Sequence, residues 1–222
     1  MGLYADALNR LDRPHIPCYC TRKESHAGGA PHGTLGPPTP EPAATCPRTP
    51  PELEAAGCRP CIRLRHQNYA FEDAVFGPFS MTLKPAAVIA LRRSDGVIAY
   101  QLAVVADDGL MGITQVVRGE VLLVSTPRQL ALFDLLGYPR PAYMHLPLLC
   151  DPEGERLAKR HASLTLASLR DAGVSPAAVA GYLGWKAGLI GALAPAHPRN
   201  LLPAFDPGRL RFLPERVLVE AD

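Results

Sequence analysis

The chain has 222 residues, a formal net charge of +2 and 47% hydrophobic residues. These values are typical of one globular domain, or part of a larger one, and exclude a disordered or collagen-like chain. The balanced charge gives no basic field that would argue for nucleic-acid binding, and no apolar run reaches the roughly 18 residues of a membrane span. Because the chain also opens without the apolar core of a signal peptide, we expect a cytoplasmic protein without membrane contact.

The first predicted element is a short amphipathic helix over residues 2–12, in which Tyr4, Leu8 and Leu11 share one face. Residues 15–20 predict a short strand or an extended turn. Residues 21–60 hold nine of the 24 prolines and few large apolar side chains. Such a stretch buries too little apolar surface to fold alone, so we expect a long loop unless a metal ion orders it.

The middle of the chain predicts short strands over residues 61–65, 71–80 and 87–93. Residues 94–96 then form a turn. The apolar run 97–107 fits either a buried helix or a buried strand, because periodicity alone does not separate the two. A second apolar run covers residues 113–117.

The following part of the chain predicts a helix that starts at Ser125, with proline in its first turn, and ends at Gly137. Leu130, Phe133 and Leu136 are its inward-facing residues. A buried strand is predicted over residues 143–149, and Cys150 is expected to be a small buried hydrophobic residue.

Two helices are predicted near the end of the chain, over residues 163–172 and 175–183, each opened by a serine. The alternation of strands and helices favours an α/β fold.

Five of the six cysteines lie within residues 18–61, which is more typical of metal ligands than of a disulfide framework in a chain without a secretion signal. Cys18 and Cys20 can hold one side of a zinc ion and Cys46 can approach from a distant loop, because zinc prefers four tetrahedral ligands. Further candidate ligands are Cys58, Cys61, His26 and His32. The alternative is that these are incidental loop cysteines, and the fourth ligand is left open.

Two further groups suit anions. Residues 154–161 combine Arg156, Lys159 and Arg160 with a histidine, a pattern that fits a triphosphate or, alternatively, a solvated basic turn. Tyr100 and Arg118 together suit a substrate carboxylate, whereas the nearby aspartate pair at 107–108 also fits a helix terminus. Dinucleotide, P-loop and zincin motifs are absent from the sequence.

Several motifs follow one another in the order found in the catalytic core of class I glutamyl-tRNA synthetase-like enzymes. The matching segments are residues 99–105, 107–108, 113–114, 116–119, 125–129, 145–149 and 156–160. Within that group the chain resembles the glutamyl-Q tRNA(Asp) synthetase family, a shortened group without an anticodon-binding domain. The resemblance covers most of residues 3–190.

The resemblance implies an enzyme that activates glutamate with ATP and Mg²⁺ and transfers it to the queuosine base of tRNA(Asp). It implies that Tyr100 and Arg118 bind glutamate and that Lys159 is the catalytic residue that binds the ATP phosphates. Lys159 belongs to a loop similar to the family's KMSKS motif, formed by Arg156, Leu157, Ala158, Lys159 and Arg160. A monomer is expected.

The resemblance also implies one zinc ion bound by Cys18, Cys20 and Cys46. The family has a tyrosine four residues before the third cysteine as its fourth ligand, but this chain has Pro42 there. Cys58 or Cys61 is the candidate replacement. A second departure is Val121, which stands where the family usually has aspartate.

The family places a HIGH-like motif well before the Cys-x-Cys pair, whereas seventeen residues precede Cys18 here. We therefore expect the C-terminal part of a class I Rossmann-like core, truncated or with a misplaced start, and inactive in adenylate formation by itself. Residues 1–66 would carry the cysteine insertion, 67–161 the second half of the core and 162–222 the C-terminal helices. The alternatives are a fragment of a glutamyl-tRNA synthetase and a non-catalytic zinc- or RNA-binding remnant.

Overall fold

The structure is a computed structural model that describes residues 2–11, 17–18, 61–63, 67–83, 88–92, 97–150, 165–210 and 216–218. The predicted turn at 94–96, the basic residues 154–161 and all of the proline-rich stretch 21–60 lie outside these residues. The chain forms two compact units. The first contains Met1–Glu72, Pro78–Val116 and Val121–Tyr143, and the second contains Asp73–Gly77, Val117–Glu120 and Met144–Asp222.

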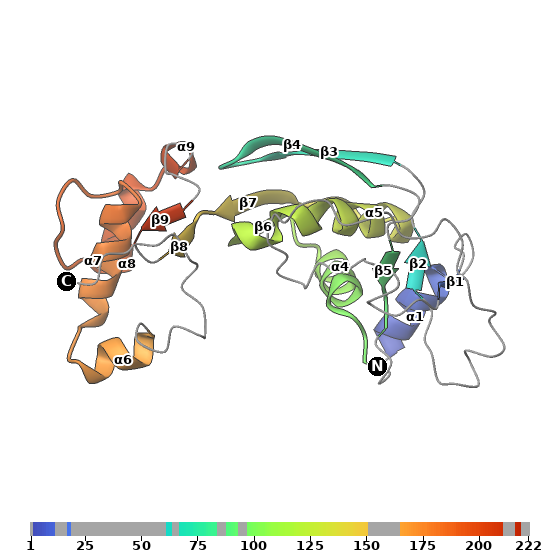
Figure 1. Ribbon diagram of the computed structural model, residues 1–222, viewed down its shortest axis with the longest axis horizontal. Coiled ribbons are helices and arrows are strands. Elements are labelled where there is room, and N and C mark those ends of the chain that lie inside the picture. Colours follow the sequence, from blue (N-terminus) through green and yellow to red (C-terminus); the bar gives the residue numbers. More distant parts are fainter. Residues whose placement is uncertain are drawn as a thin grey trace. The chain divides into compact units, whose positions relative to one another are not determined.

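Three helices contribute most of the buried apolar core of the first unit: α1 (Gly2–Leu11), α4 (Tyr100–Met111) and α5 (Thr126–Leu136). All three contact one another (Figure 1). The predicted helix at the start of the chain is confirmed, with Leu11 only 1% exposed. The ambiguous run 97–107 belongs mostly to helix α4. The Tyr4 hydroxyl donates to both carboxylate oxygens of Asp107, at 2.8 and 2.9 Å, and thereby joins α1 to α4.

Helix α5 begins where the sequence predicts, but Ser125 does not cap it. The helix begins at Thr126 and ends at Gly137, whose φ of 67° favours glycine, as predicted. Ser125, however, makes no side-chain cap, because the 3-10 helix η1 (Glu120–Ser125) runs directly into α5 and leaves Ser125 already helical. Burial of the predicted inward face is confirmed, since Leu130, Phe133 and Leu136 are at most 1% exposed.

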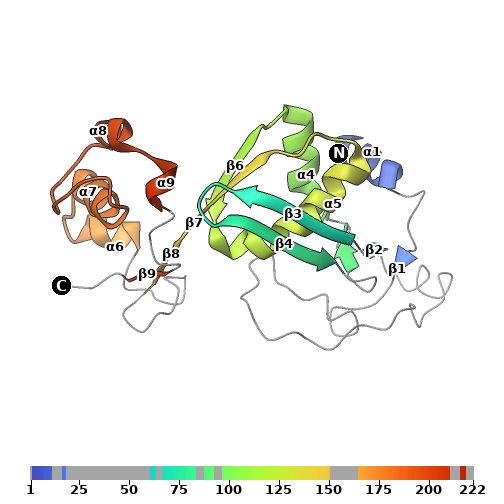
Figure 2. The same ribbon diagram turned by 90° about the horizontal axis from the view of Figure 1, so that it is seen from above.

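The largest sheet has the strand order β4-β3-β7-β6, formed by β3 (Gln67–Asp73), β4 (Gly77–Leu83), β6 (Gln115–Gly119) and β7 (Ala142–Leu146). Strands β3 and β4 form an antiparallel hairpin (Figure 2), because a three-residue turn is too short for the crossover that parallel strands require. The sheet is therefore not purely parallel.

Two smaller sheets complete the strands. The antiparallel order β1-β2-β5 joins β1 (Pro17–Cys18), β2 (Cys61–Arg63) and β5 (Val88–Ala90). Strand β8 (Leu148–Cys150) pairs in parallel with β9 (Arg216–Leu218). The strand predicted over 143–149 is confirmed except for its continuity: Pro147 separates β7 from β8, since proline has no N–H for the ladder.

The remaining elements are α6 (Leu166–Asp171), α7 (Pro176–Lys186), α8 (Pro198–Leu201), η2 (Leu202–Ala204) and α9 (Pro207–Leu210). Ser175 caps α7 as predicted, accepting a hydrogen bond from the Ala178 N–H at 3.1 Å. Helix α6 is instead capped by Thr165, which exchanges bonds with Ser168. Among the described residues, no helix combines the length and apolar character needed to cross a membrane.

Candidate functional site

The predicted glutamate-binding residues both lie in described elements. Tyr100 is the first residue of α4 in the first unit and is 41% exposed. Arg118 lies in β6, is half-buried and belongs to the second unit. Lys159 and the other four residues of the predicted KMSKS-like loop lie outside the described residues.

Behind Arg118 lies a buried carboxylate at the end of β3. Asp73 is fully buried, and its Oδ1 accepts hydrogen bonds from the backbone N–H groups of Val75 and Phe76, both at 3.0 Å. This arrangement is typical of an aspartate that stabilises the turn following it. It fixes the carboxylate relative to the β3–β4 hairpin.

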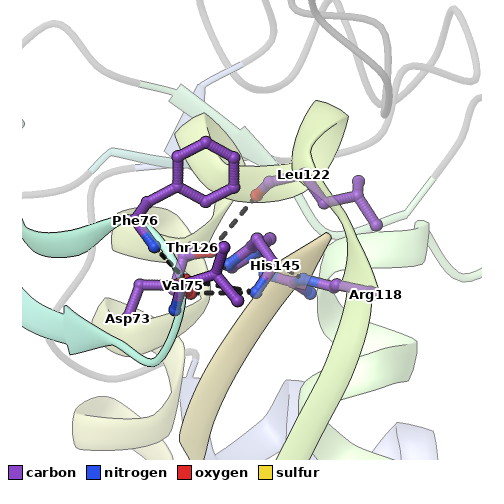
Figure 3. Close-up of polar contacts among 7 residues, drawn as sticks. All are labelled: Asp73, Val75, Phe76, Arg118, Leu122, Thr126 and His145. Carbon is purple, nitrogen blue, oxygen red and sulfur yellow. Dashed lines mark hydrogen bonds and ion pairs between the residues drawn. The ribbon is translucent and has the colours of Figure 1, made fainter. Parts of the chain in front are cut away.

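The second partner of Asp73 is His145 in β7, whose side chain is also fully buried. The His145 backbone N–H lies 3.1 and 3.3 Å from the two carboxylate oxygens, and its ring Nδ1 lies 2.6 Å from Oδ2. Figure 3 shows the imidazole lying between Asp73 and Arg118. One carboxylate thus holds both the backbone and the ring of His145.

The other ring nitrogen contacts Arg118. Its Nε lies 3.0 Å from His145 Nε2 (Figure 3). Because a guanidinium has donors and no acceptor, Nε2 must accept this bond, and the ring proton must lie on Nδ1 and point to Asp73. The three side chains therefore form a directed chain from a buried anion, through a neutral imidazole, to a half-buried cation. All three belong to the second unit.

The charge of Asp73 follows from two opposing effects. Burial by itself raises the pKa of Asp73, but the hydrogen bonds from the His145 ring and from the Phe76, Val75 and His145 N–H groups outweigh it. The pKa of Asp73 is thus lowered from its ordinary value. The carboxylate is therefore ionised at neutral pH.

We expect Asp73 to make the protein less stable in acid. Because its folded-state pKa lies below the ordinary value of 3.8, its contribution to stability is complete above that value and is lost as the pH falls through the folded-state pKa. Urea unfolding at a series of pH values should show Asp73→Asn losing less stability on acidification than the parent. The exposed Asp171→Asn, 72% exposed in its side chain, is the matched control and should follow the parent. An acid dependence of Asp73→Asn equal to that of the parent would contradict the assignment.

Of the candidate zinc ligands, the structure describes the backbone of Cys18 and Cys61. In the β1–β2 pair, Cys18 lies directly opposite Cys61. Cys20, Cys46 and Cys58 lie outside the described residues, and within the described part no group of three or more His, Cys, Asp or Glu residues could hold a metal. Cys150 is 1% exposed, which confirms its prediction as a buried residue.

Comparison with known proteins identifies the group to which this arrangement belongs. Residues 40–190 match the family described as tRNA synthetases class I (E and Q), catalytic domain. The chain is 46% identical over 229 residues to a glutamyl-Q tRNA(Asp) synthetase of Symbiobacterium thermophilum, covering 98% of this chain and 70% of that protein. It is 50% identical to the protein of the same name from Nitratidesulfovibrio vulgaris, covering 91% and 64%.

A solved structure supports the fold. A glutamate tRNA ligase from Elizabethkingia meningosepticum, in complex with its amino acid, matches with a TM-score of 0.70 at 20% identity. The match covers 97% of this chain and 50% of that one. The chain thus spans about two thirds of the length of these curated relatives and half of the solved one. The family match over residues 40–190 and the 46% identity to a curated relative show that the chain belongs to the class I tRNA synthetases for glutamate and glutamine. It forms part of their catalytic domain.

Proposed function

We propose that the protein acts in the ATP- and Mg²⁺-dependent activation of glutamate and its transfer to the queuosine base of tRNA(Asp), as a cytoplasmic monomer. The names of the two relatives support this choice of substrates. The observation that carries it is the Arg118 guanidinium held by the buried Asp73–His145 pair. A guanidinium in a fixed plane binds a carboxylate with two parallel hydrogen bonds, and glutamate offers two carboxylates.

In this proposal Arg118 and Tyr100 bind glutamate, and Lys159 binds the ATP phosphates. Lys159 then stabilises the negative charge that grows on the departing pyrophosphate. The proposal assigns the neighbouring loop residues Arg156, Leu157, Ala158 and Arg160 to the same phosphate-binding segment.

The test combines pyrophosphate exchange with RNA labelling. Exchange is measured with ATP and glutamate, aspartate or glutamine, and transfer of labelled glutamate is measured to tRNA(Asp) with and without queuosine and to tRNA(Glu). We expect exchange with glutamate and transfer to queuosine-containing tRNA(Asp) from a form extended at its N-terminus to the length of the curated relatives. Transfer to tRNA(Glu) would favour the fragment of a glutamyl-tRNA synthetase, and the absence of both reactions would favour the non-catalytic remnant.

We expect Arg118→Ala to lower the affinity for L-glutamate about 10- to 100-fold, because a hydrogen bond to a charged group contributes about 1.5–3 kcal/mol. Isothermal titration with L-glutamate measures this effect. Arg118→Lys should restore only part of the affinity, since an ammonium lacks the planar fork. Arg170→Ala is the matched control, because Arg170 is exposed and pairs with Asp171. Equal affinity of the parent and Arg118→Ala would remove Arg118 from the glutamate site.

We also propose one zinc ion held by Cys18, Cys20 and Cys46, with Cys61 as the fourth ligand in place of the family's tyrosine. Thiolates are preferred zinc ligands in closed, four-coordinate structural sites. The support is the register of the β1–β2 pair, in which Cys18 is opposite Cys61. Such a site would order the proline-rich stretch that follows Cys20.

Metal analysis of purified protein should give about one equivalent of zinc per chain for a closed structural site. We expect Cys61→Ser to lower this content and to weaken the thiolate-to-metal absorption of the cobalt-substituted protein. Cys58→Ser should change neither quantity. A loss of zinc with Cys58→Ser and not with Cys61→Ser would reassign the fourth ligand, and zinc-free parent protein would reject the site.

A further inference from the structure

The stability of the β3–β4 hairpin does not explain why the His145 ring contacts both Asp73 and Arg118. Asp73 already receives the backbone N–H groups of Val75, Phe76 and His145, so the hairpin and β7 are joined without the imidazole. The ring adds a 2.6 Å bond to Asp73 and extends to Arg118 at 3.0 Å. Buried polar side chains cost stability unless they are hydrogen-bonded. Here the two ring bonds of His145 connect the buried Asp73 to the half-buried guanidinium of Arg118.

We infer that Asp73 and His145 are positioning residues for Arg118. Asp73 holds the proton of His145 on Nδ1, Nε2 then accepts from Arg118 Nε, and this bond fixes the plane of the guanidinium that receives a substrate carboxylate. A side chain that is ordered before binding loses less entropy when the ligand arrives. The inference rests on the proposed function, in which Arg118 binds glutamate.

Two amide substitutions at position 145 separate the two ring contacts. In His145→Asn the side-chain amide occupies the place of Nδ1, so it can donate to Asp73 but cannot reach Arg118. In His145→Gln the amide oxygen occupies the place of Nε2, so it can accept from Arg118 while the bond to Asp73 is lost. Both variants remove the ring and keep the backbone N–H, so a purely structural role predicts similar behaviour.

We expect His145→Asn to weaken L-glutamate binding at least about 10-fold, as for the loss of a bond to a charged group, and His145→Gln to stay within about threefold of the parent. Asp73→Asn should behave as His145→Asn. Its amide would face Nδ1 with a donor, drive the proton to Nε2 and so turn a donor toward Arg118 Nε. In serine proteases, replacing the aspartate beside the catalytic histidine by asparagine selects the wrong tautomer of that histidine and removes most of the activity.

The tautomer itself provides a measurement that does not depend on glutamate. Nitrogen-15 NMR of the histidine-labelled, ligand-free chain should show His145 protonated at Nδ1 and unprotonated at Nε2, and the reverse in Asp73→Asn. If the parent shows this tautomer and its reversal but does not bind L-glutamate, the proposed function fails while the positioning role stands.

Two results would overturn the inference. The first is a parent His145 that carries its proton on Nε2. The second is a His145→Asn variant that binds L-glutamate as tightly as the parent under conditions in which Arg118→Ala binds weakly. Thermal unfolding of the Asn and Gln variants provides the matched stability comparison.

Discussion

Replacing Phe133 by alanine is expected to lower the free energy of unfolding of the first unit by about 3–5 kcal/mol, because the substitution removes a buried ring and leaves a cavity. Phe133 is 1% exposed and lies in α5, within the apolar cluster that α5 forms with α1, α4 and neighbouring strand residues. Urea unfolding followed by circular dichroism measures the change. Leu166→Ala is the control, since Leu166 is 74% exposed and its truncation should shift stability by less than about 0.5 kcal/mol.

A change of less than about 1 kcal/mol for Phe133→Ala would be well below the cost of an unfilled core cavity. It would mean that the three-helix core is not packed as described.

The second large effect is expected at Lys159. If this side chain stabilises the departing pyrophosphate, Lys159→Ala in the N-terminally extended form should slow glutamate-dependent pyrophosphate exchange about 10²- to 10³-fold, as for the loss of one preorganised charge partner. The affinity for L-glutamate should change by less than about threefold, because the contact is made with charge that develops during the reaction. Arg170→Ala, at an exposed cation, should leave both quantities unchanged.

Equal losses in exchange and in glutamate affinity would contradict this division of roles. They would place Lys159 in ground-state binding instead of at the leaving group.

Helix positions could be predicted where the sequence carries local signals. Pro127 and Gly137 mark the two ends of α5, and Ser175 marks the start of α7. The role of Ser125 was predicted wrongly, because its neighbours in η1 already continue the helical backbone. Strands β7 and β8 were read as one because their apolar pattern continues across Pro147, where the ladder cannot.

The candidate site could be predicted only in part. Arg118 and Tyr100 follow from motifs, and His145 lies in the matching segment 145–149, which assigns it no role. Asp73 could not be found in this way, because it lies 72 residues from His145 and no local pattern marks it. The strand order β3-β7-β6 brings Asp73, His145 and Arg118 together, and strand order depends on tertiary pairing that periodicity does not encode.

The parallel pairing of β8 with β9 has a consequence for the order of folding. Leu148 pairs with Arg216 and Cys150 with Leu218, so this sheet closes a loop of about 65 residues. The loop loses conformational entropy when it closes, and this cost comes before the strand pairing can stabilise the chain. During synthesis, helices α6 to α9 leave the ribosome before β9 and can form local contacts first. The Cys150 thiol, 1% exposed in the folded chain, would then become protected late, and its reactivity during refolding would time the closing step.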